Sequence, residues 1–228
     1  MNTSNSISNP NPNPNPNPYR LYLVTDDNQD LDTLKRVVKD AVAGGVTMVQ
    51  VREKSGDVRQ FIARAAAVKA ILAGTGVPLI INDRVDVALA VDADGVHLGQ
   101  SDMPAEFARA LIGENKLLGL SIETEQQLVD AESLPVDYLG LSAIFATPTK
   151  TNIKKEWGID GLAHAVKQSA YPIVAIGGLN ASNLDDVIAT GASGIALVSA
   201  ICHADSPKEA AKALIQQLER NASEDHES

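Results

Sequence analysis

The 228-residue chain has a single cysteine, few aromatic residues and an excess of acidic over basic side chains. Cys202 has no second cysteine to pair with, which excludes an internal disulfide and favours a reducing compartment. No apolar run approaches the ~20 residues that span a bilayer, and the N-terminus lacks the pattern of a secretory signal. A formal net charge of -10 leaves no basic face for nucleic acid. We therefore expect a cytoplasmic protein without a membrane or nucleic-acid partner.

Aromatic residues make up only 4% of the chain, whereas hydrophobic residues make up 44%. A core of Val, Ile, Leu and Ala is typical of parallel α/β proteins, whose strands are buried on both faces. Cys202 ends an apolar run that starts at Val198, so a buried structural thiol is expected there rather than a nucleophile. The oligomeric state is not readable from the sequence, and a homo-oligomer remains open.

The two ends of the chain differ from its centre. Residues 1–18 end in five Asn-Pro repeats, which remove backbone donors and oppose both helices and central strands, so this tail is expected to be disordered. Residues 221–228 are expected to be a loose C-terminal tail. The single folded domain is therefore predicted to cover residues 19–220.

Within that domain, short β-rich runs alternate with segments of helical period or polar composition. The predicted strands cover residues 20–25, 47–52, 78–82, 95–98, 116–120, 137–141, 172–177 and 194–198. The predicted helices cover residues 31–43, 57–72, 85–91, 104–112, 123–133, 162–169, 183–189 and 207–218. Eight units of about 25 residues each favour a single (β/α)₈ TIM barrel. An open doubly wound sheet is the alternative, but the first strand lacks a glycine fingerprint after it.

The segment Ser142-Ala-Ile-Phe-Ala-Thr-Pro-Thr-Lys150 follows one predicted strand and opens a basic stretch in an acidic chain. The hydroxyls of Thr147 and Thr149 and the ammonium of Lys150 are donors suited to an anion. A solvated loop that happens to carry lysine is the alternative interpretation.

A second cationic group follows the second predicted strand, at Gln50-Val-Arg-Glu-Lys54. Strand alternation puts Gln50, Arg52 and Lys54 on one side, which suits a polyphosphate. The alternative is a salt-bridged rim in which Glu53 neutralises these cations.

Two carboxylates end the next strands, at Asp83 and Asp102. Near Arg52 and Lys54 they could hold Mg²⁺ together with a diphosphate, since this ion takes few carboxylates plus phosphate oxygens and water. The alternative is that each aspartate caps the helix that follows it.

The last two predicted strands end in Gly177-Gly178 and Val198-Ser199. Glycine lets a phosphate approach backbone amides, and barrels often bind phosphate at these two loops. His97 is expected to be a core or rim histidine rather than a general base. The sequence thus predicts two anion sites and no obvious base.

Together these segments closely resemble the thiamine-phosphate synthase family. The matching segments are Tyr22-Leu-Val-Thr-Asp26, Gln50-Val-Arg-Glu-Lys54, Ile81-Asn-Asp-Arg84, Gly95-Val-His-Leu-Gly-Gln-Ser-Asp102, Gly119-Leu-Ser121, Phe145-Ala-Thr-Pro-Thr-Lys150, Ala175-Ile-Gly-Gly178 and Val198-Ser199. They run in order along essentially the whole predicted domain.

The resemblance implies an enzyme that joins an aminopyrimidine methyl diphosphate to a thiazole phosphate or its carboxylated form, releasing pyrophosphate. It implies Mg²⁺ held by Asp83 and Asp102. Implied catalytic residues are Arg52, Lys54, Ser121 and Lys150. Implied substrate-binding residues are Gln50, Val51, Arg52, Glu53, Lys54, Asn82, Ser121, Thr147, Pro148, Thr149, Lys150, Gly178, Val198 and Ser199.

The chain departs from the family pattern at Ser142-Ala143, at Ala146 and after Ser121, where Ile-Glu-Thr replaces the frequent Thr-His. These changes spare the charged residues. Two alternatives remain: a thiazole tautomerase-like barrel and a thiazole-phosphate-binding protein without catalysis. Neither needs the cations and carboxylates of the pyrimidine diphosphate site.

Overall fold

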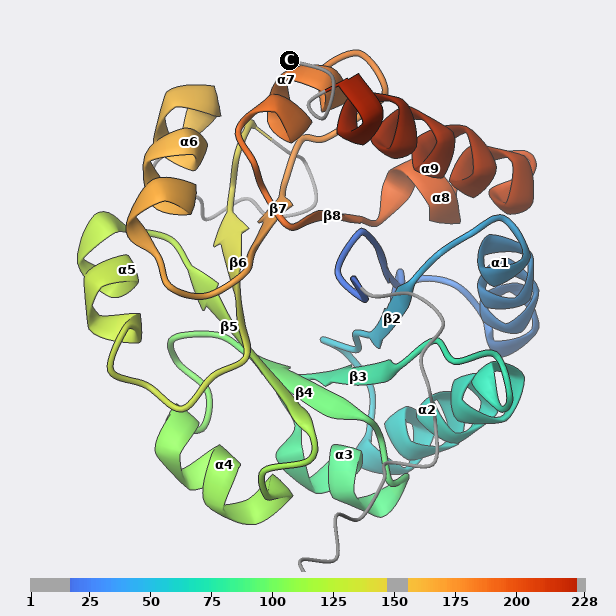
Figure 1. Cartoon of the computed structure of the whole chain (residues 1–228). Helices are drawn as coiled ribbons and strands as arrows, with labels where there is room; N and C mark the ends of the chain where they lie inside the picture. The colour runs from blue at the N-terminus through green and yellow to red at the C-terminus, as the bar shows by residue number, and fades with distance from the viewer. Residues whose placement is uncertain (1–16, 147–155, 225–228) are drawn as a thin grey trace, which may run out of the picture.

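Eight parallel strands close into a barrel in the computed structural model, which describes residues 17–146 and 156–224 (Figure 1). Each strand pairs with its neighbours in chain order, and β1 also pairs with β8 to close the ring. The predicted TIM barrel is therefore confirmed. The strands are β1 (Leu21–Val24), β2 (Met48–Val51), β3 (Leu79–Asn82), β4 (Gly95–Leu98), β5 (Leu117–Ile122), β6 (Tyr138–Ser142), β7 (Ile173–Ile176) and β8 (Gly194–Leu197).

Helices surround the barrel, as Figure 1 shows. They are α1 (Leu31–Ala43), α2 (Val58–Leu72), α3 (Val85–Ala90), α4 (Ala105–Ile112), α5 (Glu125–Ala131), α6 (Gly158–Gln168), α7 (Leu184–Ala189), α8 (Ser199–Cys202) and α9 (Pro207–Glu224). None of the helices within the described residues is long and apolar enough to cross a membrane.

Local sequence explains several helix boundaries. The side chains of Asp30, Asp57 and Thr124 accept hydrogen bonds from the first turns of α1, α2 and α5, as N-cap residues do. Gly44 is the C-cap residue of α1, directly after the predicted last residue of that helix. The three N-caps fix the residues at which α1, α2 and α5 begin.

Two sets of apolar residues make up the core. The larger set lies between the strands and the surrounding helices. The smaller set fills the barrel interior and consists of Tyr22, Val24, Met48, Ile80, Tyr138, Val174 and Ala196. The rings of Tyr22 and Tyr138 supply much of the interior volume in a chain with few aromatics.

The structure departs most from the predicted elements in three places. α6 begins at Gly158 rather than at residue 162, since backbone bonds from Trp157 to Ala143 (3.0 Å) and from Gly158 to Ile144 (2.9 Å) hold its start against the residues that follow β6. A short helix, α8, was not predicted. α9 runs to Glu224, past the predicted end at residue 218 and into the expected loose tail, because no Pro or Gly interrupts it.

The chain before β1 is attached to the barrel. Asn17 donates through Nδ2 to the Ser193 carbonyl (2.7 Å), and Thr47 Oγ1 donates to the Pro18 carbonyl (2.8 Å). Asn17 and Pro18 fall in the segment, residues 1–18, that was predicted to be a disordered tail. Residues 1–16 lie outside the described part of the chain.

Candidate functional site

A cavity of about 930 Å³ opens at the carboxyl ends of the strands, where active sites of barrels lie. Ten predicted site residues line it together. They are Gln50, Arg52, Lys54, Asn82, Asp83, Asp102, Ser121, Gly178, Val198 and Ser199.

Two other predicted site residues, Val51 and Glu53, do not line the cavity. The Val51 side chain is fully buried in the layer between strands and helices, and Glu53 is not among the residues that line the cavity. Thr147, Pro148, Thr149 and Lys150 lie outside the described residues.

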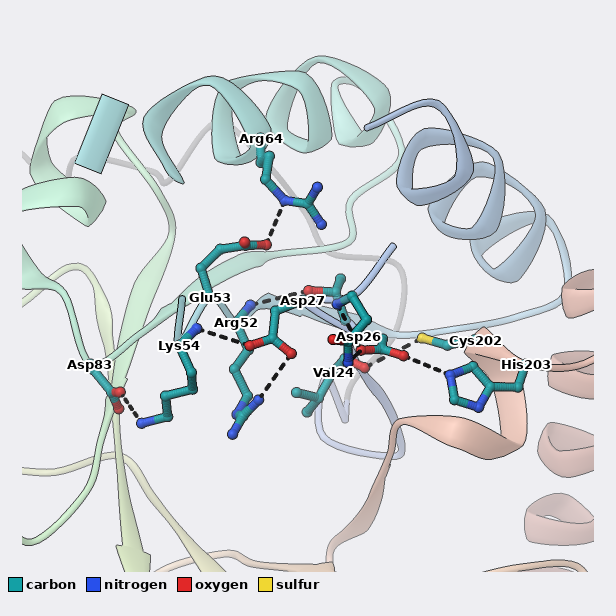
Figure 2. Close-up of polar contacts among 12 residues, drawn as sticks. Val24, Asp26, Asp27, Arg52, Glu53, Lys54, Arg64, Asp83, Cys202 and His203 are labelled. Carbon is teal, nitrogen blue, oxygen red and sulfur yellow. Dashed lines mark hydrogen bonds and ion pairs between the residues drawn. The ribbon is translucent and has the colours of Figure 1, made fainter. Parts of the chain in front are cut away.

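Asp27 organises the cations that follow β2, as Figure 2 shows. Its carboxylate accepts a hydrogen bond from the Lys54 backbone N–H (3.1 Å) and lies 3.7 Å from Arg52 Nη1. The Arg52 backbone N–H donates to Thr25 Oγ1 (3.1 Å). The end of β1 thus holds the loop that carries both cations.

Glu53 points away from these cations and pairs with Arg64 of α2, with Nε 2.5 Å from Oε1 (Figure 2). Burial raises the pKa of the Glu53 carboxyl, and Arg64 offsets only part of that effect. The rim is therefore salt-bridged, as the alternative interpretation held, but through Asp27 and Asp83 rather than Glu53, which pairs with Arg64.

Asp83 and Asp102 meet at the cavity edge. Lys54 Nζ forms an ion pair with Asp83. Asp102 accepts a hydrogen bond from the Gly99 N–H (2.7 Å). Burial raises the pKa of Asp102, and a hydrogen bond with the neighbouring Asp83 carboxyl raises it further.

Neither aspartate caps a helix. The N-cap residues of α3 and α4 are Arg84 and Pro104, and neither helix has a side-chain cap. Asp83 has a φ of 62°, in the left-handed region that non-glycine residues seldom occupy and that often marks functional sites.

The donor chemistry of this pair fits Mg²⁺. The described residues contain no group of three or more His, Cys, Asp or Glu side chains that could hold a metal. A zinc site needs three or four protein ligands, whereas Mg²⁺ keeps water and takes substrate phosphate oxygens beside one or two carboxylates. Asp83 and Asp102 offer that smaller set.

Glycine and a short helix form the opposite end of the cavity. Gly178 has a φ of 69°, and a Cβ there would lie 2.7 Å from both Phe145 Cβ and the Ala146 carbonyl oxygen. Val198 and Ser199 begin α8. A glycine with left-handed backbone and the start of α8 therefore line this end of the cavity.

Cys202 of α8 lies behind this end of the cavity. Its thiol is 3.7 Å from the Val24 carbonyl, and burial raises its pKa to about 12. The thiol is therefore protonated at neutral pH and inert, which confirms the expected structural cysteine.

Sequence reasoning placed His97 in the core or at the rim, where the structure has it, but missed Tyr22 and Tyr138. All three line the polar floor of the cavity beside Gln50 and Ser121. Strand alternation could have found Tyr22, because it faces inward with Val24. Nothing in the sequence pointed to Tyr138.

Comparisons to known proteins agree with the family resemblance seen in the sequence. The family model of thiamine monophosphate synthase matches residues 21–201. A thiamine-phosphate synthase of Vibrio parahaemolyticus is 73% identical over 201 residues, covering 88% of this chain and 98% of the relative. One of Albidiferax ferrireducens is 51% identical over 201 residues, covering 88% and 92%.

A solved structure gives the same result. Thiamine phosphate pyrophosphorylase from Pyrococcus furiosus superposes with a TM-score of 0.81 at 34% identity, covering 90% of this chain and 98% of that one. The chain therefore belongs to the thiamine monophosphate synthase family and is an enzyme of thiamine biosynthesis.

Proposed function

We propose that the cavity binds two phosphorylated substrates at its two ends and joins them. The pyrimidine substrate, 4-amino-2-methyl-5-(diphosphooxymethyl)pyrimidine, occupies the end formed by β2 to β5. The thiazole substrate, 4-methyl-5-(2-phosphoethyl)thiazole or its carboxylated form, occupies the end formed by β7 and β8. The observation that carries this proposal is one cavity with cations and paired carboxylates at one end and glycine at the other.

The residues divide accordingly. Arg52 and Lys54 meet the diphosphate, since a guanidinium fork and an ammonium complement its charge. Gln50, Asn82 and Ser121 contact the pyrimidine portion, with Lys150 reaching the diphosphate. The thiazole phosphate is bound by Thr147 and Thr149 and by backbone groups at Gly178, Val198 and Ser199. Val51, Glu53 and Pro148 complete the proposed substrate-binding set.

Asp83 and Asp102 would hold Mg²⁺. The ion would supply positive charge to the diphosphate oxygens. Lys54, which pairs with Asp83 in this structure, is placed to turn toward the diphosphate.

The reaction breaks the bond between the pyrimidine methylene carbon and the diphosphate oxygen, and the electron pair leaves with pyrophosphate. Arg52, Lys54 and Lys150 stabilise the departing charge. The electron-rich aminopyrimidine supports the resulting carbocation, and the thiazole nitrogen lone pair forms the new carbon–nitrogen bond. Positioning and charge stabilisation carry the catalysis, so no general base is required at the bond-forming step.

A tautomerase or a binding protein would have no use for the cationic end. Lys54→Met tests that end, because it removes the ammonium and keeps most of the stem. Lys69→Met is the matched control, since Lys69 lies on the outside of the barrel on α2, 3.9 Å from Asp94.

Calorimetric titration with pyrophosphate and Mg²⁺ supplies the measurement. We expect Lys54→Met to weaken binding about tenfold or more, as loss of a charge-assisted contact does. Lys69→Met should bind as the unmodified protein does. Equal binding by all three proteins would refute the assignment of this end to the diphosphate.

A further inference from the structure

A continuous series of hydrogen bonds crosses the barrel beneath the cavity. Gln50 Nε2 donates to the Tyr22 hydroxyl (2.7 Å), which lies 2.9 Å from the Tyr138 hydroxyl. That hydroxyl lies 3.0 Å from His97 Nδ1, and His97 Nε2 lies 2.9 Å from Ser121 Oγ. The series links five strands, β1, β2, β4, β5 and β6, and ends at a residue proposed to contact substrate.

Two strand glycines make room for this series. A Cβ at Gly119 would lie 2.4 Å from His97 Nδ1 and 2.5 Å from the Tyr138 hydroxyl. A Cβ at Gly140 would lie 3.0 Å from His97 Cε1. Glycine weakens a strand interior and marks close approach, so its presence beside both partners indicates that the His97–Tyr138 contact is built into the barrel.

Both tyrosines keep their hydrogens. Tyr22 and Tyr138 are almost completely buried, and burial raises the pKa of each phenol well above its ordinary value. Each therefore offers one O–H donor and one oxygen that accepts.

The direction of the series follows from Gln50, whose amide nitrogen can only donate. Tyr22 accepts a hydrogen bond from Gln50 and must therefore donate its own hydrogen bond to Tyr138. Tyr138 then donates to His97 Nδ1. His97 accepts there and donates from Nε2 to Ser121 Oγ, so the Ser121 hydrogen is directed into the cavity.

With Gln50 Nε2 as the donor to Tyr22, every other arrangement leaves a buried hydroxyl hydrogen without an acceptor. If Ser121 donated to His97, Tyr22 would accept from both Gln50 and Tyr138, and its own hydrogen would have no partner among the described residues. A doubly protonated His97 would donate to Tyr138 and leave one tyrosine hydrogen unpaired. An unpaired buried donor is costly, so the first arrangement is favoured.

We propose that His97 is a positioning residue, held neutral with its hydrogen on Nε2, that makes Ser121 a hydrogen-bond donor to the pyrimidine diphosphate. The acceptor is a ring nitrogen or a phosphate oxygen of that substrate. The identity of the ligand rests on the proposed function, whereas the direction of the series does not.

Nitrogen NMR of the ¹⁵N-labelled protein without substrate tests the direction. We expect a pyrrole-type resonance for His97 Nε2 and a pyridine-type resonance for Nδ1, assigned by their loss in His97→Gln. Tyr138→Phe should convert this pattern to a mixture of tautomers, because the donor to Nδ1 is gone. A hydrogen on Nδ1 in the unmodified protein would overturn the proposal and would mean that Gln50 presents its oxygen to Tyr22.

Kinetics test the link to Ser121. We expect His97→Gln and Ser121→Ala each to lower kcat/KM for the pyrimidine substrate about tenfold. The double variant should lose no more than Ser121→Ala alone, since His97 acts through Ser121. If the kcat/KM loss of the double variant is the product of the two single losses, the proposal is overturned.

Tyr19→Phe is the control for removing a nearby hydroxyl. The Tyr19 ring packs on Tyr138, with centroids 4.9 Å apart, but its hydroxyl is outside the series. The Tyr19→Phe variant should have the same kcat/KM and the same His97 resonances as the unmodified protein.

The split between constants identifies the acceptor. A lower kcat points to a phosphate oxygen, where charge grows as the bond breaks, and a higher KM with kcat unchanged points to a ring nitrogen. If the unmodified protein makes no thiamine phosphate, the proposed function fails while the NMR result still decides the direction of the series.

Discussion

Gly178 provides a sharp test of the thiazole phosphate end. Its φ of 69° is a conformation that alanine adopts only with strain, and an added Cβ would lie 2.7 Å from the Ala146 carbonyl oxygen. Gly178→Ala therefore changes both the backbone energy and the space at the cavity edge. Gly74→Ala is a matched control, because Gly74 has a φ of 76° and no atom within 4 Å of an added Cβ.

Both substitutions place alanine in a left-handed backbone conformation. Only Gly178→Ala also brings the added Cβ into collision with neighbouring atoms. Left-handed alanine costs roughly 1–2 kcal/mol, and each 1 kcal/mol lowers Tm by about 2–4 °C in a domain of this size. Gly74→Ala should therefore lower Tm by about 2–8 °C. Gly178→Ala should lower it further, because the Phe145–Ala146 backbone has to move.

Melting curves and steady-state kinetics check both parts. We expect Gly178→Ala to raise KM for the thiazole phosphate about tenfold or more, with a smaller change for the pyrimidine substrate. Gly74→Ala should leave both constants unchanged. Equal Tm losses for the two variants, together with an unchanged thiazole KM, would refute the steric argument and the phosphate assignment.

Three further predictions concern the metal pair, the thiol and the N-terminal segment. Asp83→Ala and Asp102→Ala should each raise the Mg²⁺ concentration for half-maximal rate about tenfold or more, measured as pyrophosphate release; unchanged Mg²⁺ dependence would refute the metal assignment. Because burial raises the pKa of Cys202 to about 12, its thiol stays protonated below that pH. At about pH 8 it should react with a disulfide reagent about a thousandfold more slowly than in urea-unfolded protein, and similar rates would contradict the burial. Removing residues 1–16 should leave Tm unchanged, whereas removing residues 1–18 should lower it by about 2–4 °C through the lost bonds to the barrel; identical Tm values would show that those bonds add nothing.

The fold followed from the sequence because the alternation of strands and helices is local. Strand runs rich in Val, Ile and Leu, and caps such as Gly44, carry that information within a few residues. Helix ends were less predictable. The start of α6 depends on bonds from Trp157 and Gly158 to the residues just after β6, which no local pattern reveals.

The cationic end of the site was predictable for a similar reason. Arg52 and Lys54 alternate on one strand end, and barrel topology brings Asp83 and Asp102 beside them. The pairing of Glu53 with Arg64 was not predictable, because it depends on which face of α2 returns over the strand. Tyr138 contacts Tyr22 across 116 positions of sequence, so only the closed barrel brings the two hydroxyls together.

The most direct test of the central claim is pyrophosphate release from the full-length protein with both substrates, with each alone, and after Mg²⁺ is chelated. We predict release only when both substrates and Mg²⁺ are present, with thiamine phosphate formed in equal amount. Release from the pyrimidine substrate alone at the full rate, or none with both substrates while thiazole phosphate still binds, would contradict the account.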